Sequence, residues 1–425
     1  DEVADLVLRT NYLQTQAISL SAFQSAAMLD VHSRLIAFLE TEGRIDRRIS
    51  NLPDESEILD LREAGKGLTC PEFAVLIGHV KLTLSDTLLS SNLPDLPFCH
   101  RALTDYFPSK LRETFAEKIA EHRLKREIIT NVVVNEIVNW GGITFVFRLA
   151  QETGATLPGV CKAYFAAREI FEQRELRDRI ASLDNIVPAD RQAALLLESR
   201  KLIERGTRWL LRFEDPADDV DFMIERYGPG VSLLAGRMTE LVDAPMRARI
   251  DARRTRIATD TIPQDLSERV ACFEELSVAL DIVAVAERTG EPVESAAAVY
   301  YRIGSALSLH WMRECINQLP RTNRWQTLAR TAFREDLDLQ ERELAFSIIR
   351  DGKATRDARP SVELWLKRHR TATQRVRNFM QALMLEPTVD STMIAAALRE
   401  LRGLGQLAAS GRIEQENNKP ASGNP

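Results

Sequence analysis

Histidine and cysteine are the side chains of this 425-residue chain most able to hold a metal or attack a substrate. A zinc site needs them clustered, as in HExxH or paired CxxC spacings. The histidines are isolated from one another: His32, His79, His100, His122, His310 and His369. The cysteines are equally scattered: Cys70, Cys99, Cys161, Cys272 and Cys315. An odd set of isolated cysteines is typical of reduced thiols in a cytoplasmic protein, so we predict no metal ligands.

The sequence lacks the common phosphate-binding and nucleophile motifs. No GxGxxG follows a strand pattern, and neither GxxxxGK[ST] nor GxSxG occurs. Gly228-Pro229-Gly230 resembles a phosphate loop only superficially, because no strand precedes it. Pairs of carboxylate residues are frequent, and none can be distinguished from the solvated charged residues of a helix surface. The sequence therefore predicts no catalytic residues and no cofactor-binding residues in this chain.

Two weaker patterns leave alternatives open. Five arginines between Arg247 and Arg256 could bind phosphate or an acidic partner, but a solvated helix face explains them better. His310-Trp311 lies in an apolar helical pattern, which favours a core or interface pair over a ligand. Neither pattern predicts a chemical function.

Bulk properties exclude several classes of protein. The net charge is −6 and the isoelectric point about 5.7, whereas nucleic-acid binders usually carry a basic excess. No apolar run approaches the ~18 residues of a membrane span, and no signal peptide opens the chain. We expect a cytoplasmic protein with no nucleic-acid or membrane partner. Because the first residue is Asp1, we also expect a segment of a longer protein.

Scarce helix breakers indicate the fold class. The chain contains 19 glycines and 17 prolines, with abundant Ala, Leu, Arg and Glu. We predict an all-α array of fifteen or more helices, in one region or two subdomains, without a Rossmann sheet. The expected parts are N-terminal helices at 1–67, a central subdomain at 68–215, a C-terminal subdomain at 216–410 and a disordered tail at 411–425.

The stretch from Leu68 to Phe171 carries the clearest helix punctuation. Thr69 as N-cap, Pro71 in the first turn and Glu72 near the positive end predict a helix start. Its apolar stripe is Phe73, Leu76, Ile77, Val80, Leu84 and Leu88. Pro108 predicts another start, with an apolar stripe of Leu111, Phe115 and Ile119. Gly154 predicts a helix stop with positive φ.

Two further local predictions concern ambiguous segments. The segment from Ile128 to Trp140 is rich in β-branched residues, yet i, i+4 spacing and the lack of a turn favour helix. Asn131, Asn135 and Asn139 would then line one face, either as a solvated or locally satisfied face or as a seam against another domain. Tyr227-Gly-Pro-Gly predicts a turn.

A weak internal repeat links two distant segments. Leu149 to Phe165 and Val285 to Tyr301 align at an offset of 136 residues. Both predict a helix, a Thr-Gly stop, a short turn and an Ala-rich helix bearing paired aromatics. Duplication and chance similarity of two helical hairpins both explain the match.

Several longer segments resemble a known family. They include Asn11-Tyr-Leu-Gln-Thr-Gln-Ala, Leu68-Thr-Cys-Pro-Glu-Phe-Ala-Val-Leu, Tyr106-Phe-Pro, His122-Arg-Leu-Lys-Arg-Glu-Ile-Ile, Asn139 and Thr144-Phe-Val-Phe-Arg-Leu. In order and spacing they resemble the C-terminal helical region of the large bacterial NAD-specific glutamate dehydrogenases. The match is specific over residues 1 to about 215 and weaker beyond. Cys70 and Trp140-Gly141 depart from the family pattern.

The resemblance implies an enzyme that oxidises L-glutamate to 2-oxoglutarate and ammonia with NAD. It also implies that the catalytic lysine, the aspartate and the Rossmann domain lie upstream, outside this chain. We therefore expect a non-catalytic scaffold, oligomer contact or regulatory coupler, whose partners are the upstream catalytic domains and further copies in a homo-oligomer. Residues 1 to about 40 are expected to pack on the catalytic core. The alternative is an independent helical protein–protein interaction module.

Overall fold

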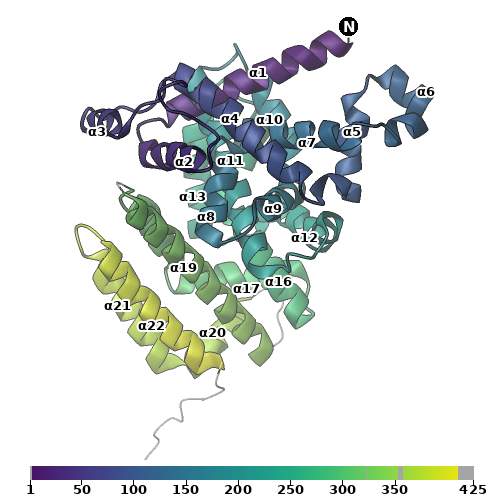
Figure 1. Cartoon of the computed structure of the whole chain (residues 1–425). Helices are drawn as coiled ribbons and strands as arrows, with labels where there is room; N and C mark the ends of the chain where they lie inside the picture. Colours follow the sequence, from purple (N-terminus) through teal and green to yellow (C-terminus); the bar gives the residue numbers. More distant parts are fainter. Residues whose placement is uncertain (1, 322, 353–357, 410–425) are drawn as a thin grey trace, which may run out of the picture. The chain divides into compact units, whose positions relative to one another are not determined.

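A computed structural model describes residues 2–321, 323–352 and 358–409, and Figure 1 shows that helices make up its secondary structure. Within these ranges no strand occurs, which confirms the all-α prediction. Two compact units are present: unit 1 comprises Asp1–Ser232 and Ala258–Phe273, and unit 2 comprises Leu233–Ile257 and Glu274–Pro425. The predicted tail at 411–425 lies outside the described residues.

Unit 1 is built around α9, whose residues Val160, Cys161, Tyr164 and Ala167 are fully buried. Helices α4, α8, α10 and α11 pack against it. The elements of this unit are α1 Glu2–Phe23, α2 Leu29–Thr41, α3 Glu55–Glu63, α4 Cys70–Leu89, η1 Leu93–Asp95, η2 Pro97–Cys99, α5 His100–Tyr106, α6 Ser109–Ala120, α7 Lys125–Glu136, η3 Ile137–Gly141, α8 Phe145–Thr153, α9 Leu157–Ile170, α10 Gln173–Ala181, α11 Ala189–Phe213 and α14 Gln264–Ala271.

Unit 2 is centred on α19, which packs against α16, α17, α18, α20 and α22. Leu337, Leu344 and Ala345 of α19 are fully buried there. Its elements are α13 Ala244–Ile257, α15 Phe273–Leu276, α16 Ala279–Thr289, α17 Val293–Ala306, α18 Leu309–Gln318, α19 Arg324–Asp351, α20 Arg359–Arg368, α21 Arg370–Met384 and α22 Ser391–Ala409. Helix α12, Val220–Leu241, contributes residues to both units, and the first residue of α15, Phe273, belongs to unit 1.

The predicted helix punctuation is confirmed at α4 and α8. Helix α4 begins at Cys70 with Thr69 as N-cap, and the Glu72 carboxylate accepts hydrogen bonds from the Thr69 amide (2.5 Å) and hydroxyl (2.7 Å). The apolar stripe of α4 is buried except for the partly exposed Val80. Helix α8 ends at Gly154 with φ of 75°.

The β-branched segment is helical, as predicted, but its last turn is unusual. Helix α7 runs to Glu136 and continues as a π turn from Ile137 to Gly141. Gly142, with φ of 102°, then ends the helix. Burial of Ile129, Val133, Val134, Ile137 and Val138 outweighs the local strand preference of these residues.

Helix α6 begins after Pro108, as predicted, but its apolar stripe is not buried. Leu111 and Phe115 are exposed, and only Ile119 is buried. Phe115 also departs from helical geometry, with φ of −128° and ψ of 30°. Since α6 packs chiefly on α5, most of its surface contacts no other element of unit 1.

The turn predicted at Tyr227-Gly-Pro-Gly is wrong. These residues lie inside α12, which carries Pro229 in its interior. Tyr227 is buried edge-on against Trp209, with ring centroids 5.3 Å apart, and donates a 2.6 Å hydrogen bond to Glu214. Tertiary packing of Tyr227 therefore holds the helix through a sequence that would otherwise favour a turn.

Membrane-spanning potential is limited in the described ranges. No single helix there is both long and apolar enough to cross a bilayer. Only Lys125–Gly141 and Phe145–Thr153 taken together reach that length and composition, and they are bent by 84°.

Candidate functional site

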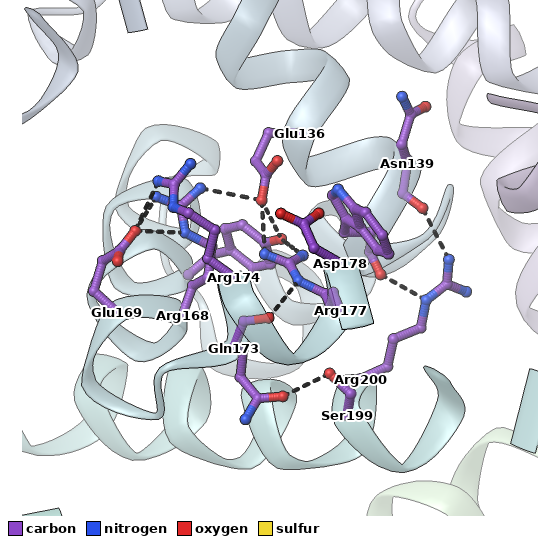
Figure 2. A network of polar contacts seen from close by, with 12 residues as sticks. Glu136, Asn139, Arg168, Glu169, Gln173, Arg174, Arg177, Asp178, Ser199 and Arg200 are labelled. Atoms are coloured by element: carbon purple, nitrogen blue, oxygen red, sulfur yellow. Dashed lines mark hydrogen bonds and ion pairs between the residues drawn. The ribbon is translucent and has the colours of Figure 1, made fainter. Parts of the chain in front are cut away.

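A cluster of charges around two buried arginines joins α7, α9 and α10 in unit 1 (Figure 2). Glu136 of α7 receives Arg177 Nη2 at 2.8 Å and Arg168 Nη1 at 3.1 Å. Both arginine side chains are only 3% exposed. Glu169 receives Arg174 Nη2 at 2.9 Å and also pairs with Arg168. We call this set of six residues, Glu136, Tyr164, Arg168, Glu169, Arg174 and Arg177, the Glu136 network.

All three guanidinium nitrogens of Arg177 donate hydrogen bonds. Its Nη1 donates to Tyr164 Oη at 3.0 Å and its Nε to the Gln173 carbonyl at 3.1 Å. The guanidinium also lies over the Trp140 ring, 4.6 Å from the centroid. Five donors in a planar fork suit such a crowded buried position, which a lysine could not fill. Arg177 therefore ties α7, the π turn, α9 and α10 to one another.

The protonation states of Glu136 and Tyr164 favour a structural role over a catalytic one. Burial opposes ionisation of Glu136, but the guanidiniums of Arg177 and Arg168 outweigh it and hold the pKa of that carboxyl at about 2. Burial raises the pKa of Tyr164 above its ordinary value. At neutral pH the carboxylate stays ionised and the phenol neutral, so neither group is poised to exchange a proton with a substrate.

Arg200 of α11 extends the site to the π turn, as Figure 2 shows. Its Nε donates to the Trp140 carbonyl at 2.6 Å and its Nη2 to the Asn139 carbonyl at 3.0 Å. Burial lowers the pKa of Arg200 to about 10. The guanidinium thus satisfies two carbonyl groups that the helix end leaves without helical partners, at the negative end of the helix dipole.

The predicted asparagine line is only partly formed. Asn135 Nδ2 donates to Asn131 Oδ1 at 3.1 Å, which is the locally satisfied arrangement. Asn139 is instead buried, and its Oδ1 has no hydrogen-bond partner among the described residues. The π turn adds a residue to the last turn and so rotates Asn139 away from the line.

The internal repeat is confirmed in the structure and extends beyond the predicted hairpins. Helices α9 and α17 begin at Leu157 and Val293 and end at Ile170 and Ala306, an offset of 136 residues at both ends. Helices α10 and α18 begin at Gln173 and Leu309, which are also 136 residues apart. Glycines with φ of 75° and 71° end α8 and α16 at equivalent positions. Each unit therefore contains one copy of the same helical motif.

The copies also share two unusual details. Glu172 and Ser308, 136 residues apart, both adopt left-handed backbone geometry, with φ of 51° and 60°. Non-glycine residues seldom do so. Tyr164 and Arg177 in the first copy correspond to Tyr300 and Arg313 in the second. This agreement favours duplication over chance similarity of two hairpins.

The second copy holds a differently balanced charge cluster. Arg313 Nη2 donates to Asp338 Oδ1 and to Glu341 Oε2, both at 2.6 Å, so that one guanidinium serves two carboxylates. Burial raises the pKa of Glu341 to about 6, although Arg313 opposes the shift. Tyr300 Oη is buried and has no hydrogen-bond partner within the described ranges. We call Tyr300, Arg313, Asp338 and Glu341 the Glu341 network.

A glycine explains part of the difference. Gly304 lies where the first copy has Arg168. A Cβ at Gly304 would collide with the Glu341 carboxyl group and would lie 2.9 Å from His310 Cε1. The glycine therefore makes room for a carboxylate from α19, whereas Arg168 in the first copy pairs with Glu136 from α7.

The arginine run of α13 lies beside this second network. A pocket is lined there by Met246, Arg249, Arg253, Glu274, Glu275, Val278, Tyr300, Tyr301, His310, Arg313 and Glu314. Arg253 is paired with Glu275, and Arg249 lies 3.6 Å from Glu314. Arg247 donates to the carbonyls of Thr239 and Val242. The run is thus engaged with this chain's own acceptors.

Burial sets the protonation state of two of the histidines and two of the cysteines. Burial lowers the pKa of His32 to about 4, and burial with Arg313 lowers that of His310 to about 3, so both rings are neutral at pH 7. Burial raises the pKa of Cys99 to about 12 and that of Cys161 further, which keeps both thiols protonated. No group of three metal-ligating side chains occurs in the described part of the chain.

Neither charge network was predicted from the sequence. Their members come from helices far apart in the chain, and single charged residues on helices resemble solvated ones. The one available signal was the repeat, because Tyr164 with Arg177 and Tyr300 with Arg313 share the same spacing.

Comparisons with known proteins agree with the resemblance. A family model described as "Glutamate dehydrogenase, C-terminal" matches residues 65–403. The NAD-specific glutamate dehydrogenase of Pseudomonas aeruginosa is 36% identical over 97% of this chain. Those of Halomonas elongata and Mycobacterium tuberculosis are 34% and 32% identical over 96% and 97% of it.

These matches extend over nearly the whole chain but only part of each relative. Each covers 25% of the relative's length, so the chain spans about a quarter of the curated relatives that it matches. The family model accounts for most of the residues in both units. The chain therefore belongs to the family formed by the C-terminal region of glutamate dehydrogenases.

Proposed function

We propose that this chain is the non-catalytic C-terminal part of an NAD-specific glutamate dehydrogenase, which converts L-glutamate, NAD and water to 2-oxoglutarate, ammonia and NADH. In this proposal NAD and glutamate bind upstream domains that this chain does not include. The chain serves as a scaffold or regulatory coupler for those domains, within a cytoplasmic homo-oligomer. The observation that carries the proposal is the match of nearly the whole chain to one quarter of each relative.

The state of the buried charges supports a structural role. Arg168 and Arg177 are held by Glu136, and Arg313 by Asp338 and Glu341. These arginines therefore have carboxylate partners inside the chain and are not left to hold a substrate carboxylate. A buried charge cluster of this kind fixes the arrangement of helices, since breaking one pair leaves an uncompensated charge.

The proposal is tested by expressing the complete reading frame, the same protein truncated before residue 1, and this chain alone. Glutamate-dependent NADH formation is measured for all three by absorbance. We expect activity from the complete protein and none from this chain alone. We also expect the truncated protein to lose thermal stability or oligomeric state. Glutamate oxidation by this chain alone would contradict a non-catalytic role.

An independent helical interaction module is the alternative. It would be favoured if the complete reading frame carried no glutamate-dependent NAD reduction and this chain bound unrelated proteins. Two variants, Arg177→Met in unit 1 and Arg313→Met in unit 2, test the structural role directly. Each removes a buried guanidinium that no substrate contacts in the proposal, so each should lower the stability of its unit.

A further inference from the structure

We propose that the first half of α1, together with the α5–α6 hairpin, is the docking surface for the upstream part of the complete protein. This inference rests on the proposed function for the identity of its partner. It replaces the broader expectation for residues 1 to about 40 with a specific surface. The apolar side chains of this surface are Val3, Leu6, Val7, Tyr106, Leu111 and Phe115, which we call the α1–α6 surface.

Helix α1 is packed over only part of its length. Ala17 and Leu20 in its second half are buried, where α1 contacts α4 and the π turn. Residues 2–11, in contrast, are all exposed. Val3 and Val7 are 53% and 55% exposed, and Leu6 lies between them on the same helical face. An apolar face of this kind is usually covered by another element.

The exposed half of α1 is nevertheless held in place. Glu2 accepts hydrogen bonds from the Ser109 amide at 2.9 Å and the Ser109 hydroxyl at 2.8 Å, at the start of α6. Arg112 Nη2 of α6 lies 3.6 Å from the same carboxylate. Arg9 pairs with Asp178 at 2.6 Å. Polar contacts thus fix the helix while its apolar side chains remain exposed.

The hairpin bound by Glu2 shows the same imbalance. Tyr106, Leu111 and Phe115 are each between 42% and 51% exposed. Along α6 only Ile119 is buried, although Leu111, Phe115 and Ile119 form a regular i, i+4 stripe. A helix with such a stripe normally packs it against a neighbour. Two adjacent elements of unit 1 therefore present apolar faces that unit 1 itself leaves bare.

The length of the relatives points to the occupant. Each relative carries about three times as much sequence outside the matched region as within it, since the match covers 25% of its length. The matched family model is a C-terminal one, so the additional sequence lies upstream. An intramolecular partner also benefits from a high effective concentration, so a modest apolar patch with a polar rim suffices.

Hydroxyl-radical footprinting of the complete protein tests the inference without any mutation. Leu82 and Leu59, which are 65% and 53% exposed elsewhere in unit 1, are the matched controls. We expect Leu6, Leu111 and Phe115 to be oxidised at least ~5-fold more slowly than these controls. Oxidation at the rate of the controls would overturn the proposal. Protection that disappears when the protein is diluted to a monomer would assign the surface to a second copy and also overturn it.

A pair of variants of the complete protein gives a second test. Val7→Asp places a charge in the proposed interface, whereas Leu82→Asp places one on an exposed face outside it. We expect Val7→Asp to raise the oxidation rate of Leu111 and Phe115 several-fold and Leu82→Asp to leave it unchanged. Equal behaviour of the two variants would contradict the proposal. Protection without glutamate oxidation would remove the proposed function and leave the docking surface intact, so the two failures are distinguishable.

Discussion

Arg177 donates a 3.0 Å hydrogen bond to Tyr164, whereas the Tyr300 hydroxyl, at the equivalent position of the second copy, has no partner among the described residues. The same tyrosine–arginine spacing has thus been kept in two units while the surrounding charges diverged. In the first copy two arginines share one carboxylate, and in the second two carboxylates share one arginine. Because burial dominates at Glu341 and the arginines dominate at Glu136, the pKa values of the two carboxyl groups shift in opposite directions.

Removing Arg177 is expected to be severe. Arg177→Met leaves the ionised Glu136 carboxylate with one buried partner fewer, and loss of one member of such a pair costs about 3–5 kcal/mol in the free energy of unfolding. The control is Arg9→Met, which breaks the exposed Arg9–Asp178 pair and should cost less than about 1 kcal/mol. Urea unfolding followed by tryptophan fluorescence measures both. Similar costs for the two variants would contradict the structural role of the Glu136 network.

The two tyrosines should respond differently to loss of the hydroxyl. Tyr164→Phe removes the bond to Arg177 and should lower the free energy of unfolding by about 1 kcal/mol. Tyr300→Phe removes a buried hydroxyl without a partner and should be neutral or slightly stabilising. Hydrogen exchange at the amides of α9 and α17 reports each unit separately. A larger loss of protection for Tyr300→Phe than for Tyr164→Phe would reverse the expected order.

The pH dependence of unit 2 should carry the signature of Glu341. Its pKa of about 6 in the folded chain exceeds the ordinary value of 4.5, so the folded state binds the proton more tightly. Unit 2 should therefore gain stability as pH falls from above 6 toward 4.5, by up to about 2 kcal/mol. The Glu341→Gln variant should lack this gain. The measurement is the difference in urea midpoint between the two proteins at several pH values, and a constant difference would contradict the shift.

The first network should respond in the opposite direction. The Glu136 pKa of about 2 lies below its ordinary value of 4.5, so its contribution is present above pH 4.5 and is lost as pH falls toward 2. Acid unfolding should therefore begin in unit 1, and hydrogen exchange at the amides of α7 and α10 would detect it first. Earlier loss of protection in α17 and α19 would show that another group controls acid stability.

Substitution of Gly304, even by alanine, should lower the stability of unit 2. Gly304→Ala places a methyl group against Glu341 and His310 in a buried site, which should cost about 1–3 kcal/mol. Gly236 is the matched control, since it also lies in a helix contributing to unit 2, and nothing beyond its own stretch of helix backbone lies within 4 Å of its Cβ position. Gly236→Ala should stabilise by about 0.5–1 kcal/mol through helix propensity. The midpoint of thermal unfolding should fall for Gly304→Ala and rise for Gly236→Ala. Equal shifts of the two midpoints would contradict a steric role for Gly304.

Local chemistry predicted most helices, because their starts and stops depend on residues close in sequence. Thr69 with Glu72 and Gly154 are examples, and both were found where expected. The π turn after Glu136 could not be predicted, since it depends on the Arg200 side chain, sixty residues away, which binds the Trp140 carbonyl. Tyr227-Gly-Pro-Gly failed for the same reason: its helical state depends on burial against Trp209.

The candidate site was less predictable than the fold. Glu136 and Arg177 look like solvated helix charges in the sequence, and only their meeting across α7 and α10 makes them a buried pair. The apolar stripe of α6 shows a second limit of prediction from sequence. Leu111, Phe115 and Ile119 correctly predict an amphipathic helix, but a stripe cannot state whether its partner lies within the same chain.

The left-handed residues Glu172 and Ser308 carry a consequence for protein engineering. Glu172 has a reason to keep its side chain, because it accepts a 2.7 Å hydrogen bond from Ser232 and pairs with Arg269. Nothing in the structure explains a side chain at Ser308, where glycine would adopt φ of 60° without steric conflict. Replacing Ser308 with glycine is thus a route to thermostabilisation. The same replacement at Glu172 would remove the contacts with Ser232 and Arg269.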